Sequence, residues 1–203
     1  MARRLKAMGN QRYKNGFNVT FHPDLIDAPL KWKKPRMVFV NSMGDMFHED
    51  VPLEYIQRVF GTMEKASQHI FQVLTKRSTR MLELSSQLRW PKNVWLGVTI
   101  ESGKYNYRAD NLRATPALTK FLSIEPMIAS VDGLDLHGID WVITGGESGF
   151  KARAIEECWV LAIRDNCIAQ KIPFFFKQWG GNNKKKAGRL LQGKIWDQYP
   201  SHA

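Results

Sequence analysis

The chain has 203 residues, 43% of them hydrophobic, and a formal net charge of +11. That is enough apolar material for one sizeable core, and no apolar run approaches the ~18 residues that a membrane-spanning helix needs. The N-terminal residues 1–5 lack the apolar stretch and cleavage site of a secretory signal. We therefore expect a single domain over residues 1–203, located in the cytoplasm.

The positive charge is concentrated at the two ends of the chain. Residues 1–36 hold nine Lys or Arg and two Asp, and residues 177–194 hold six Lys or Arg and no acid. Because the rest of the chain is close to neutral, we expect the ends to bind a polyanion such as nucleic acid. The alternative is a solvated lysine-rich surface without a partner. The candidate phosphate-binding residues are Arg3, Arg4, Lys6, Lys184, Lys185, Lys186 and Arg189.

Short apolar runs rich in β-forming residues recur over residues 37–181, between a basic N-terminal helix and loop (1–36) and a basic tail (182–203). Nearly continuous hydrophobic runs suit strands covered on both faces, and the spacing leaves room for one crossover helix each. The sequence therefore predicts six parallel strands. They span residues 37–40, 70–74, 94–98, 120–124, 141–144 and 172–176.

Helical periodicity supports two of the crossovers. Pro52 suits a first helical position, and an apolar stripe at helical spacing follows over residues 53–66. A second helix is expected over residues 155–170, with two glutamates in its first turn. The crossover after Ile124 is weaker, because proline and glycine interrupt it.

Six strand–helix units are fewer than the eight of a complete TIM barrel, which needs ~250 residues. The predicted fold class is therefore α/β, as a partial or open TIM-type barrel of about six parallel strand–helix units. A doubly wound open sheet is the alternative, because strand order cannot be read from spacing.

Polar side chains follow each predicted strand, at the edge of the sheet where α/β proteins bind their ligands. Carboxylates and cations at one mouth can hold ammonium, hydroxyl and phosphate groups together, so we expect a nucleotide or small-molecule pocket. Specifically, Glu125, Glu147, Lys76 and Lys177 should converge on it. The alternative is that these ions only satisfy strand ends and pair with each other. The candidate ligand-binding residues are Asn41, Asp45, Thr75, Lys76, Arg77, Thr99, Glu101, Glu125, Gly145, Gly146, Glu147, Lys177 and Gln178.

Two further patterns carry weaker signals. Asp45, His48 and the two acids after it contain metal-ligand types, but no second histidine lies nearby, so an exposed acidic loop is the better interpretation and no metal is expected. Gly145 and Gly146 could bring backbone N–H groups close to an anion, although two glycines in a strand–helix turn are weak evidence alone.

The only cysteines, Cys158 and Cys167, fall on one predicted helix. Nine residues at ~100° each place them on opposite faces, so we expect no disulfide and interpret both as core thiols. Two cysteines also exclude a cluster held by three cysteines of this chain.

Six phrases of the sequence resemble the phage Gp37/Gp68 family. They are VNSMGDMFHED (40–50), LTKR (74–77), NVWLGVTIES (93–102), FLSIEP (121–126), WVITGGESG (141–149) and FFKQWG (175–180). The resemblance covers nearly the whole chain. It implies a phage or prophage protein acting in the cytoplasm of a host cell.

The resemblance also implies a radical-SAM-type partial barrel. Members of that family begin with a Cys-rich segment of the kind that binds an iron–sulfur cluster, and it would precede Met1. By this resemblance the chain lacks the first strand and the cluster loop, so an iron–sulfur cluster is not expected, while S-adenosylmethionine remains a candidate ligand. Gly145-Gly146-Glu147 lies too late in the barrel to take the role of the radical-SAM Gly-Gly-Glu.

Three functions remain open at this stage. The first is an enzyme of radical-SAM type acting on nucleic acid or a nucleotide, although this chain lacks the cluster cysteines. The second is a phage binding protein without catalysis, for example an anti-defence factor that targets a host nucleoprotein. The third is a regulator that binds S-adenosylmethionine or a nucleotide.

Overall fold

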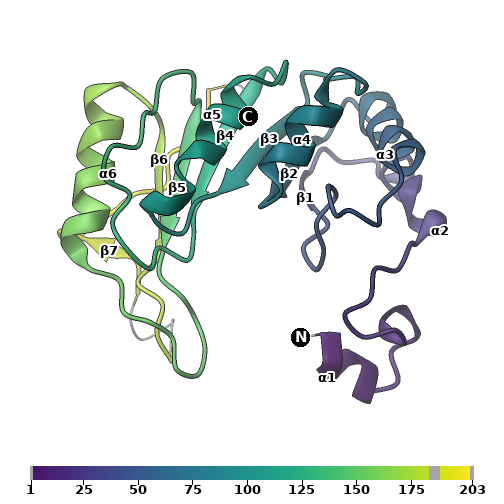
Figure 1. Cartoon of the computed structure of the whole chain (residues 1–203), viewed down its shortest axis with the longest axis horizontal. Helices are drawn as coiled ribbons and strands as arrows, with labels where there is room; N and C mark the ends of the chain where they lie inside the picture. Colours follow the sequence, from purple (N-terminus) through teal and green to yellow (C-terminus); the bar gives the residue numbers. More distant parts are fainter. Residues whose placement is uncertain (1, 183–187, 202–203) are drawn as a thin grey trace.

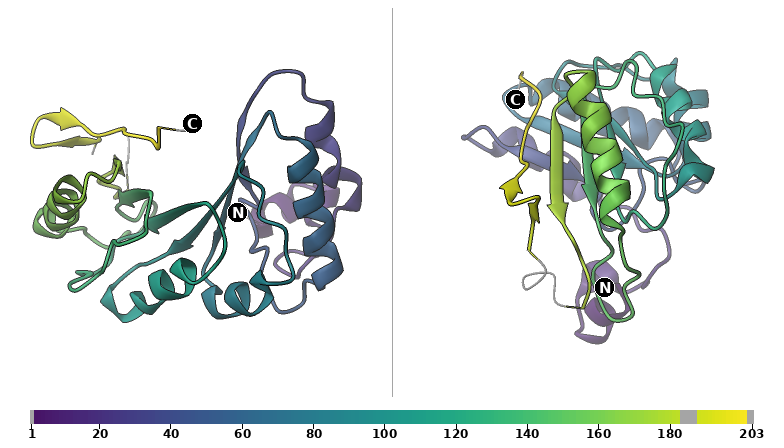
Figure 2. Two further views of the ribbon diagram at one scale, coloured as in Figure 1. Left: turned by 90° about the horizontal axis from the view of Figure 1, so that it is seen from above. Right: turned by 90° about the vertical axis from the view of Figure 1, so that its left-hand side faces the viewer.

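The computed structural model describes residues 2–182 and 188–201. Its centre is a parallel sheet whose six strands follow one another in chain order and curve into an open half-barrel (Figures 1 and 2). This confirms the predicted partial barrel and excludes the doubly wound alternative, in which the strand order reverses. The strands are β1 (Met37–Val40), β2 (Ile70–Thr75), β3 (Val94–Thr99), β4 (Thr119–Ile124), β5 (Trp141–Gly145) and β6 (Phe174–Gln178).

The crossover helices cover the convex side of the half-barrel (Figure 2). They are α3 (Leu53–Lys65), α4 (Ser78–Ser85), α5 (Tyr107–Arg113), which follows the short turn η3 (Gly103–Tyr105), and α6 (Glu157–Ala169). The connection from β4 to β5 contains no helix; the sequence predicted only a weaker crossover there, because proline and glycine interrupt it. Within the described part of the chain, no helix is long and apolar enough to cross a membrane.

Two predicted positions shift by one or two residues. Pro52 has a ψ of 147° and is the extended cap before α3, not its first helical residue. The last strand begins at Phe174, two residues later than predicted. In both cases a proline lies just before the regular element, and such element boundaries are the part of a sequence pattern that is hardest to locate.

The sheet has a different core on each face. On the convex face, Leu96 and Val98 of β3 pack with helix residues such as Ile56 and Val160 in one large cluster. On the concave face, Trp95, Phe121 and Trp141 form a separate cluster. Because side chains alternate along a strand, β3 contributes to both. This explains why its sequence is apolar throughout.

One glycine makes the concave cluster possible. A Cβ at Gly97 of β3 would overlap the ring of Phe121 on the neighbouring strand β4. Without a side chain, Gly97 leaves room for that ring to lie directly over the strand. Phe121 is therefore 1% exposed, although the crossover helices among the described residues lie on the other face of the sheet (Figure 2).

Two segments extend past the carboxyl ends of the strands in the same direction (Figures 1 and 2). We call residues 2–20 the N-terminal lobe; it contains α1 (Ala2–Ala7) and η1 (Gln11–Tyr13), and the short helices α2 (Pro23–Ile26) and η2 (Ala28–Lys31) join it to the sheet. We call residues 146–155, between β5 and α6, the tip loop. The two segments flank the end of the sheet where ligands bind in α/β folds.

The C-terminal residues close the opposite end of the concave face. After the hairpin of β7 (Leu190–Leu191) and β8 (Lys194–Ile195), the chain runs antiparallel to β6, with a bridge between Asp197 and Phe175. The ring of Tyr199 then lies 5.0 Å from that of Trp141. In this tail the ring of Trp196 packs against that of Phe174 at 5.9 Å, whereas Ile195 is 48% and Tyr199 45% exposed.

Candidate functional site

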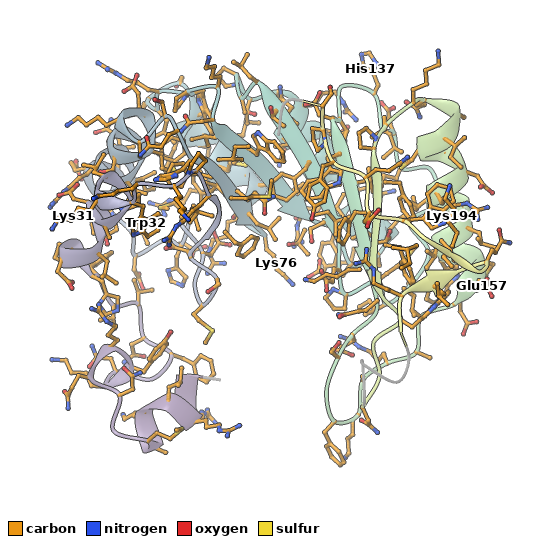
Figure 3. All side chains as sticks on the ribbon, turned by 180° about the vertical axis from the view of Figure 1, so that it is seen from behind. Lys31, Trp32, Lys76, His137, Glu157 and Lys194 are labelled. Atoms are coloured by element: carbon orange, nitrogen blue, oxygen red, sulfur yellow. The ribbon has the colours of Figure 1, made fainter. Side chains whose placement is uncertain are left out.

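The carboxyl ends of the strands form the mouth of the half-barrel. Lys76, Glu101 and Glu125 follow β2, β3 and β4, and Lys177 lies near the end of β6. Side chains alternate between the two faces along a strand. These four positions lie an even number of residues after concave-face residues of the same strands, so their side chains enter the mouth. Figure 3 shows Lys76 there, between the N-terminal lobe and the tip loop.

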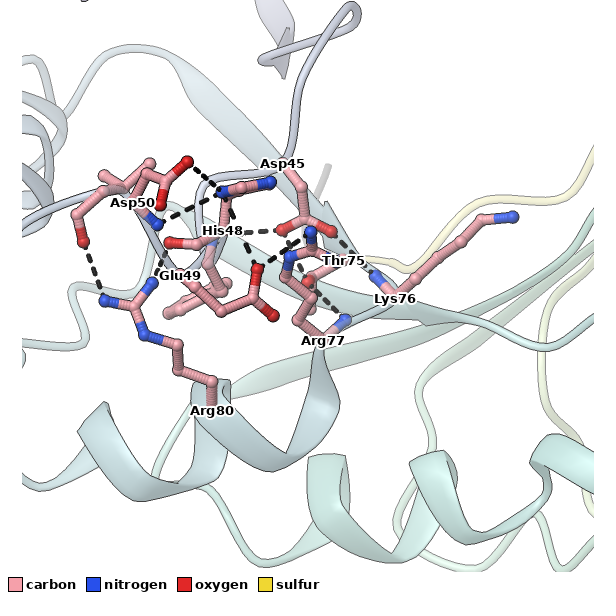
Figure 4. A network of polar contacts seen from close by, with 10 residues as sticks. Asp45, His48, Glu49, Asp50, Thr75, Lys76, Arg77 and Arg80 are labelled. Carbon is pink, nitrogen blue, oxygen red and sulfur yellow. Dashed lines mark hydrogen bonds and ion pairs between the residues drawn. The ribbon is translucent and has the colours of Figure 1, made fainter. Parts of the chain in front are cut away.

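Asp45 ties the loop after β1 to the end of β2 (Figure 4). Its Oδ1 accepts hydrogen bonds from the Thr75 hydroxyl at 2.7 Å and the Phe47 amide at 2.9 Å, and its Oδ2 accepts one from the Lys76 amide at 3.1 Å. The Thr75 hydroxyl in turn accepts a hydrogen bond from the Arg77 amide. Asp45 and Thr75 thus hold the loop after β1 against the end of β2, through the backbone amide and not the side chain of Lys76.

The acidic part of this loop is held by two arginines from the start of α4 (Figure 4). Arg77 pairs with Glu49 at 3.0 Å, and Arg80 donates to the backbone oxygens of His48 and Val51. A backbone hydrogen bond, with help from Arg77, lowers the pKa of Glu49. No group of three or more His, Cys, Asp or Glu that could hold a metal occurs within the described residues.

Glu101 is the most enclosed carboxylate of the mouth. Its side chain is 12% exposed and receives two cations, Lys76 from β2 and the buried Arg108 from α5, the latter at 2.9 Å. Arg108 also donates to the carbonyl of Thr99 at 2.7 Å. One carboxylate neutralises only one of the two cations, so this cluster has a net positive charge. The charge is accessible to solvent at Lys76, whose side chain is 51% exposed.

Glu125 forms a second cluster on the other side of the mouth. Lys177 pairs with its Oε2 at 3.0 Å, and the Gln178 amide donates to its Oε1 at 3.2 Å. Gln178 also donates to Ser148 at 3.0 Å, which links this cluster to the tip loop. As with Lys76, about half of the Lys177 side chain is exposed, 52%.

Gly146 allows the tip loop to cross the segment after β6. A Cβ at Gly146 would overlap the carbonyl oxygen of Trp179, and one at Gly180 would overlap that of Glu147. The Gly146 amide donates to the Gln178 carbonyl at 2.9 Å. This amide is engaged within the protein and cannot cradle an anion, so the glycines serve close packing here.

Glu147 is held by Arg153 across the base of the tip loop. Three hydrogen bonds of 2.8 to 2.9 Å, two from the guanidinium and one from the Arg153 amide, reach its carboxylate. They lower the pKa of Glu147 to about 2. The same contacts, and the charge of Glu101, raise the pKa of Arg153. Arg153 therefore braces the base of the tip loop.

A hollow of about 450 Å³ lies on the β1–β3 side of the mouth. Its apolar wall is made by Phe39, Met43 and Leu74, and Phe39 is 47% exposed. Five of the predicted ligand-binding residues also line it: Asn41, Asp45, Thr75, Lys76 and Thr99. The volume falls in the range of small-molecule sites, which is about 300–1,000 Å³.

The other predicted residues lie around the hollow. Glu125, Glu147, Lys76 and Lys177 share one end of the sheet but belong to three separate ion pairs, and Lys76 alone of the four lines the hollow. Sequence reasoning missed Arg108, Arg153 and Phe39. Strand alternation was a usable signal for Phe39, whereas nothing in the spacing marks the two arginines.

The basic ends contribute unequally. Arg3, Arg4 and Lys6 lie on α1 of the N-terminal lobe. Arg189 packs its guanidinium over the ring of Phe175 at 5.0 Å and donates to the Trp196 carbonyl, so it has a packing role. The predicted residues Lys184, Lys185 and Lys186 lie outside the described residues.

The two cysteines do not fit an iron–sulfur cluster. Both are free, Cys158 being exposed and Cys167 buried, which corrects the prediction that both are core thiols. They lie on opposite faces of α6, and burial raises the pKa of Cys167 to about 12. Cluster ligation needs several thiolates at one site, so the described residues provide no place for a cluster.

Residues 1–200 match the model of a family described as "Protein of unknown function (DUF5131)". Because the match covers nearly the whole chain, the chain belongs to this family. Comparison with curated proteins and with solved structures gave no match.

Proposed function

We propose that this member of the DUF5131 family binds nucleic acid at the mouth of its half-barrel, with one nucleotide unit in the hollow beside β1. The observation that carries the proposal is the composition of this hollow. It joins an exposed aromatic ring, Phe39, to a half-exposed cation, Lys76, within one cavity of about 450 Å³. A nucleotide presents the matching groups, a flat base and a phosphate.

The polar lining supports the same ligand. Asn41 offers an amide that can both donate and accept hydrogen bonds, as base edges and ribose hydroxyls require. Asn41 has a φ of 54°, an uncommon backbone conformation for a residue other than glycine that recurs at binding sites. Base–aromatic stacking on Phe39 would supply affinity with little base preference.

Charge around the mouth favours a polymer over a free nucleotide. The N-terminal lobe, which extends past the strand ends on the same side, has five Lys or Arg and no acid over residues 2–20. A single nucleotide in the hollow does not need this additional charge. A nucleic acid strand does, because each neutralised phosphate releases counterions and adds affinity.

The proposal does not assign a reaction. We also propose that the chain is related to the phage Gp37/Gp68 family and that its barrel is of radical-SAM type. The phrases shared with that family support this relationship, and the parallel half-barrel is compatible with it. The cysteine arrangement speaks against cluster chemistry by the described residues. Binding without catalysis is therefore the function that the geometry supports best.

The test is a titration of the whole protein with labelled single-stranded DNA and RNA, and with duplexes, at low salt. Free nucleotides and S-adenosylmethionine serve as competitors. Phe39→Ala and Lys76→Gln should each weaken binding, while the controls Ile168→Ala, on α6, and Lys92→Gln, before β3, should not. Binding of no nucleic acid would refute the proposal; tight binding of a free nucleotide alone would replace it with a small-molecule function.

A further inference from the structure

The tip loop carries the most exposed large hydrophobic side chain of the described residues. Phe150 is 88% exposed, and the Lys151 ammonium lies 5.7 Å from the centre of its ring. A phenylalanine at the end of a projecting loop contributes nothing to the core. A single exposed ring is common on protein surfaces, so the inference depends on the cation beside this ring and on the loop that holds it.

The loop behind Phe150 is well braced. Arg153 closes its base through three hydrogen bonds to Glu147, and the amide of Gly149 donates to the Gly181 carbonyl at 3.1 Å. Lys151 has a φ of 60°, a conformation that residues with a side chain adopt rarely. A braced loop loses little conformational entropy when its end binds a ligand.

The N-terminal lobe repeats the same pair of groups. Phe17 is 69% exposed, and the guanidinium of Arg3 lies 5.6 Å from the centre of its ring. The lobe and the tip loop project in the same direction past the strand ends, with Lys76 between them (Figure 3). Each side of the mouth thus offers one aromatic ring accompanied by one cation.

We infer that Phe150 and Phe17 are stacking positions for unpaired bases, and that the nucleic acid bound at the mouth is single-stranded. This inference rests on the proposed function and adds its substrate class. In a duplex the base faces are covered by their neighbours, whereas a single strand can turn them toward aromatic side chains. Lys151 and Arg3 then neutralise the adjacent phosphates.

A protein partner fits these features less well. Protein interfaces have a contiguous apolar centre, whereas these two rings lie on separate projections beside cations. Alternation of aromatic rings and positive charge instead matches the repeat of base and phosphate along a strand.

The experiment measures binding of a labelled oligothymidylate to the parent protein, Phe150→Ala and Phe17→Ala. Leu118→Ala is the control, since Leu118 is 65% exposed but precedes β4 at the other end of the sheet. Each phenylalanine variant should bind roughly 5- to 150-fold more weakly, as expected for one lost stacking contact. Leu118→Ala should bind like the parent, and Phe150→Trp should retain the affinity.

A strand of the same length without bases separates stacking from charge. The parent and Phe150→Ala should bind this abasic strand equally, because only the phosphates remain. Equal affinity of Phe150→Ala, Phe17→Ala and Leu118→Ala for oligothymidylate would overturn the inference while leaving the proposed function intact, as would a preference of the parent for duplex. If the parent binds no nucleic acid, the proposed function fails together with the inference.

Discussion

The two ends of the concave face are built from the same strands but differ in what fills them. At the amino ends, Trp95, Phe121 and Trp141 are at most 3% exposed and the C-terminal tail packs against them. At the carboxyl ends, Lys76 and Lys177 remain half exposed beside a hollow. The amino ends of the strands thus form a packed core, whereas the carboxyl ends are open to a ligand.

This difference separates stability from binding along each strand. The aromatic end stabilises the half-barrel by burying large rings, for which replacement is costly. The ion pairs of Lys76 and Lys177 at the mouth are partly exposed, and such pairs contribute little to stability. Substitutions at the aromatic end should therefore lower stability. Substitutions at the mouth should weaken ligand binding with little loss of stability.

The largest expected effect is loss of the aromatic end. Trp141→Ala removes a ring that contacts Trp95, Phe121, Phe175 and Tyr199. It should lower the free energy of unfolding by about 3–5 kcal/mol, measured by urea denaturation followed by circular dichroism. Leu118→Ala, at an exposed position, should change it by less than about 0.5 kcal/mol. A small effect of Trp141→Ala would mean that this end is not a core.

Adding one methyl group at the centre of the same face should also destabilise the protein. Gly97→Ala places a Cβ in the space of the Phe121 ring, and overpacking of this kind costs about 1–3 kcal/mol. The matched control is Gly61→Ala in α3, where a Cβ meets nothing within 4 Å and alanine should stabilise the helix by up to about 1 kcal/mol. Destabilisation by both variants alike would contradict the steric explanation.

The tip loop should keep its shape far into the acid range. Hydrogen bonds from Arg153 lower the pKa of Glu147 from 4.5 to about 2. A lowered carboxyl pKa stabilises the folded state fully at pH values above the unfolded pKa of 4.5, and this contribution is lost progressively as the pH falls from there through the folded pKa of about 2. A carboxyl titration by NMR should show this midpoint, and Arg153→Gln should move it up toward 4.5. A midpoint near 4.5 in the parent would show that the pair does not form in solution.

The fold could be read from the sequence more fully than the site. Runs such as residues 94–98 are apolar at every position, and this pattern predicted the strands and their parallel direction. The proline and glycines after Ile124 only weakened the expectation of a helix there, and the structure has none. Strand ends in turn located Lys76 and Lys177. The roles of Arg108 and Arg153 could not be predicted, because these arginines reach Glu101 and Glu147 only through the packing of α5 and of the tip loop.

Which aromatic side chains are exposed could not be predicted from the sequence either. Trp179 and Trp196 both pack within the fold, Trp179 against Phe176 at 4.7 Å and Trp196 against Phe174 at 5.9 Å. Phe150 lies in a glycine-rich turn and gave no signal. Whether a ring is a core anchor or a contact surface depends on tertiary packing, which residue type and spacing do not encode.

The salt dependence of single-strand binding tests the central claim most directly. The affinity of the parent for oligothymidylate should fall linearly with salt on a log–log plot, because phosphate neutralisation releases counterions. Joint replacement of Lys76 and Lys177 by Gln should reduce the magnitude of the slope by about 1.4, or 0.7 per lost phosphate contact, with little loss of stability. Joint replacement of Lys65 and Lys92, at the other end of the sheet, should leave the slope unchanged. An unchanged slope in the Lys76 and Lys177 double variant, or no binding by the parent at low salt, would contradict a nucleic-acid site at the mouth.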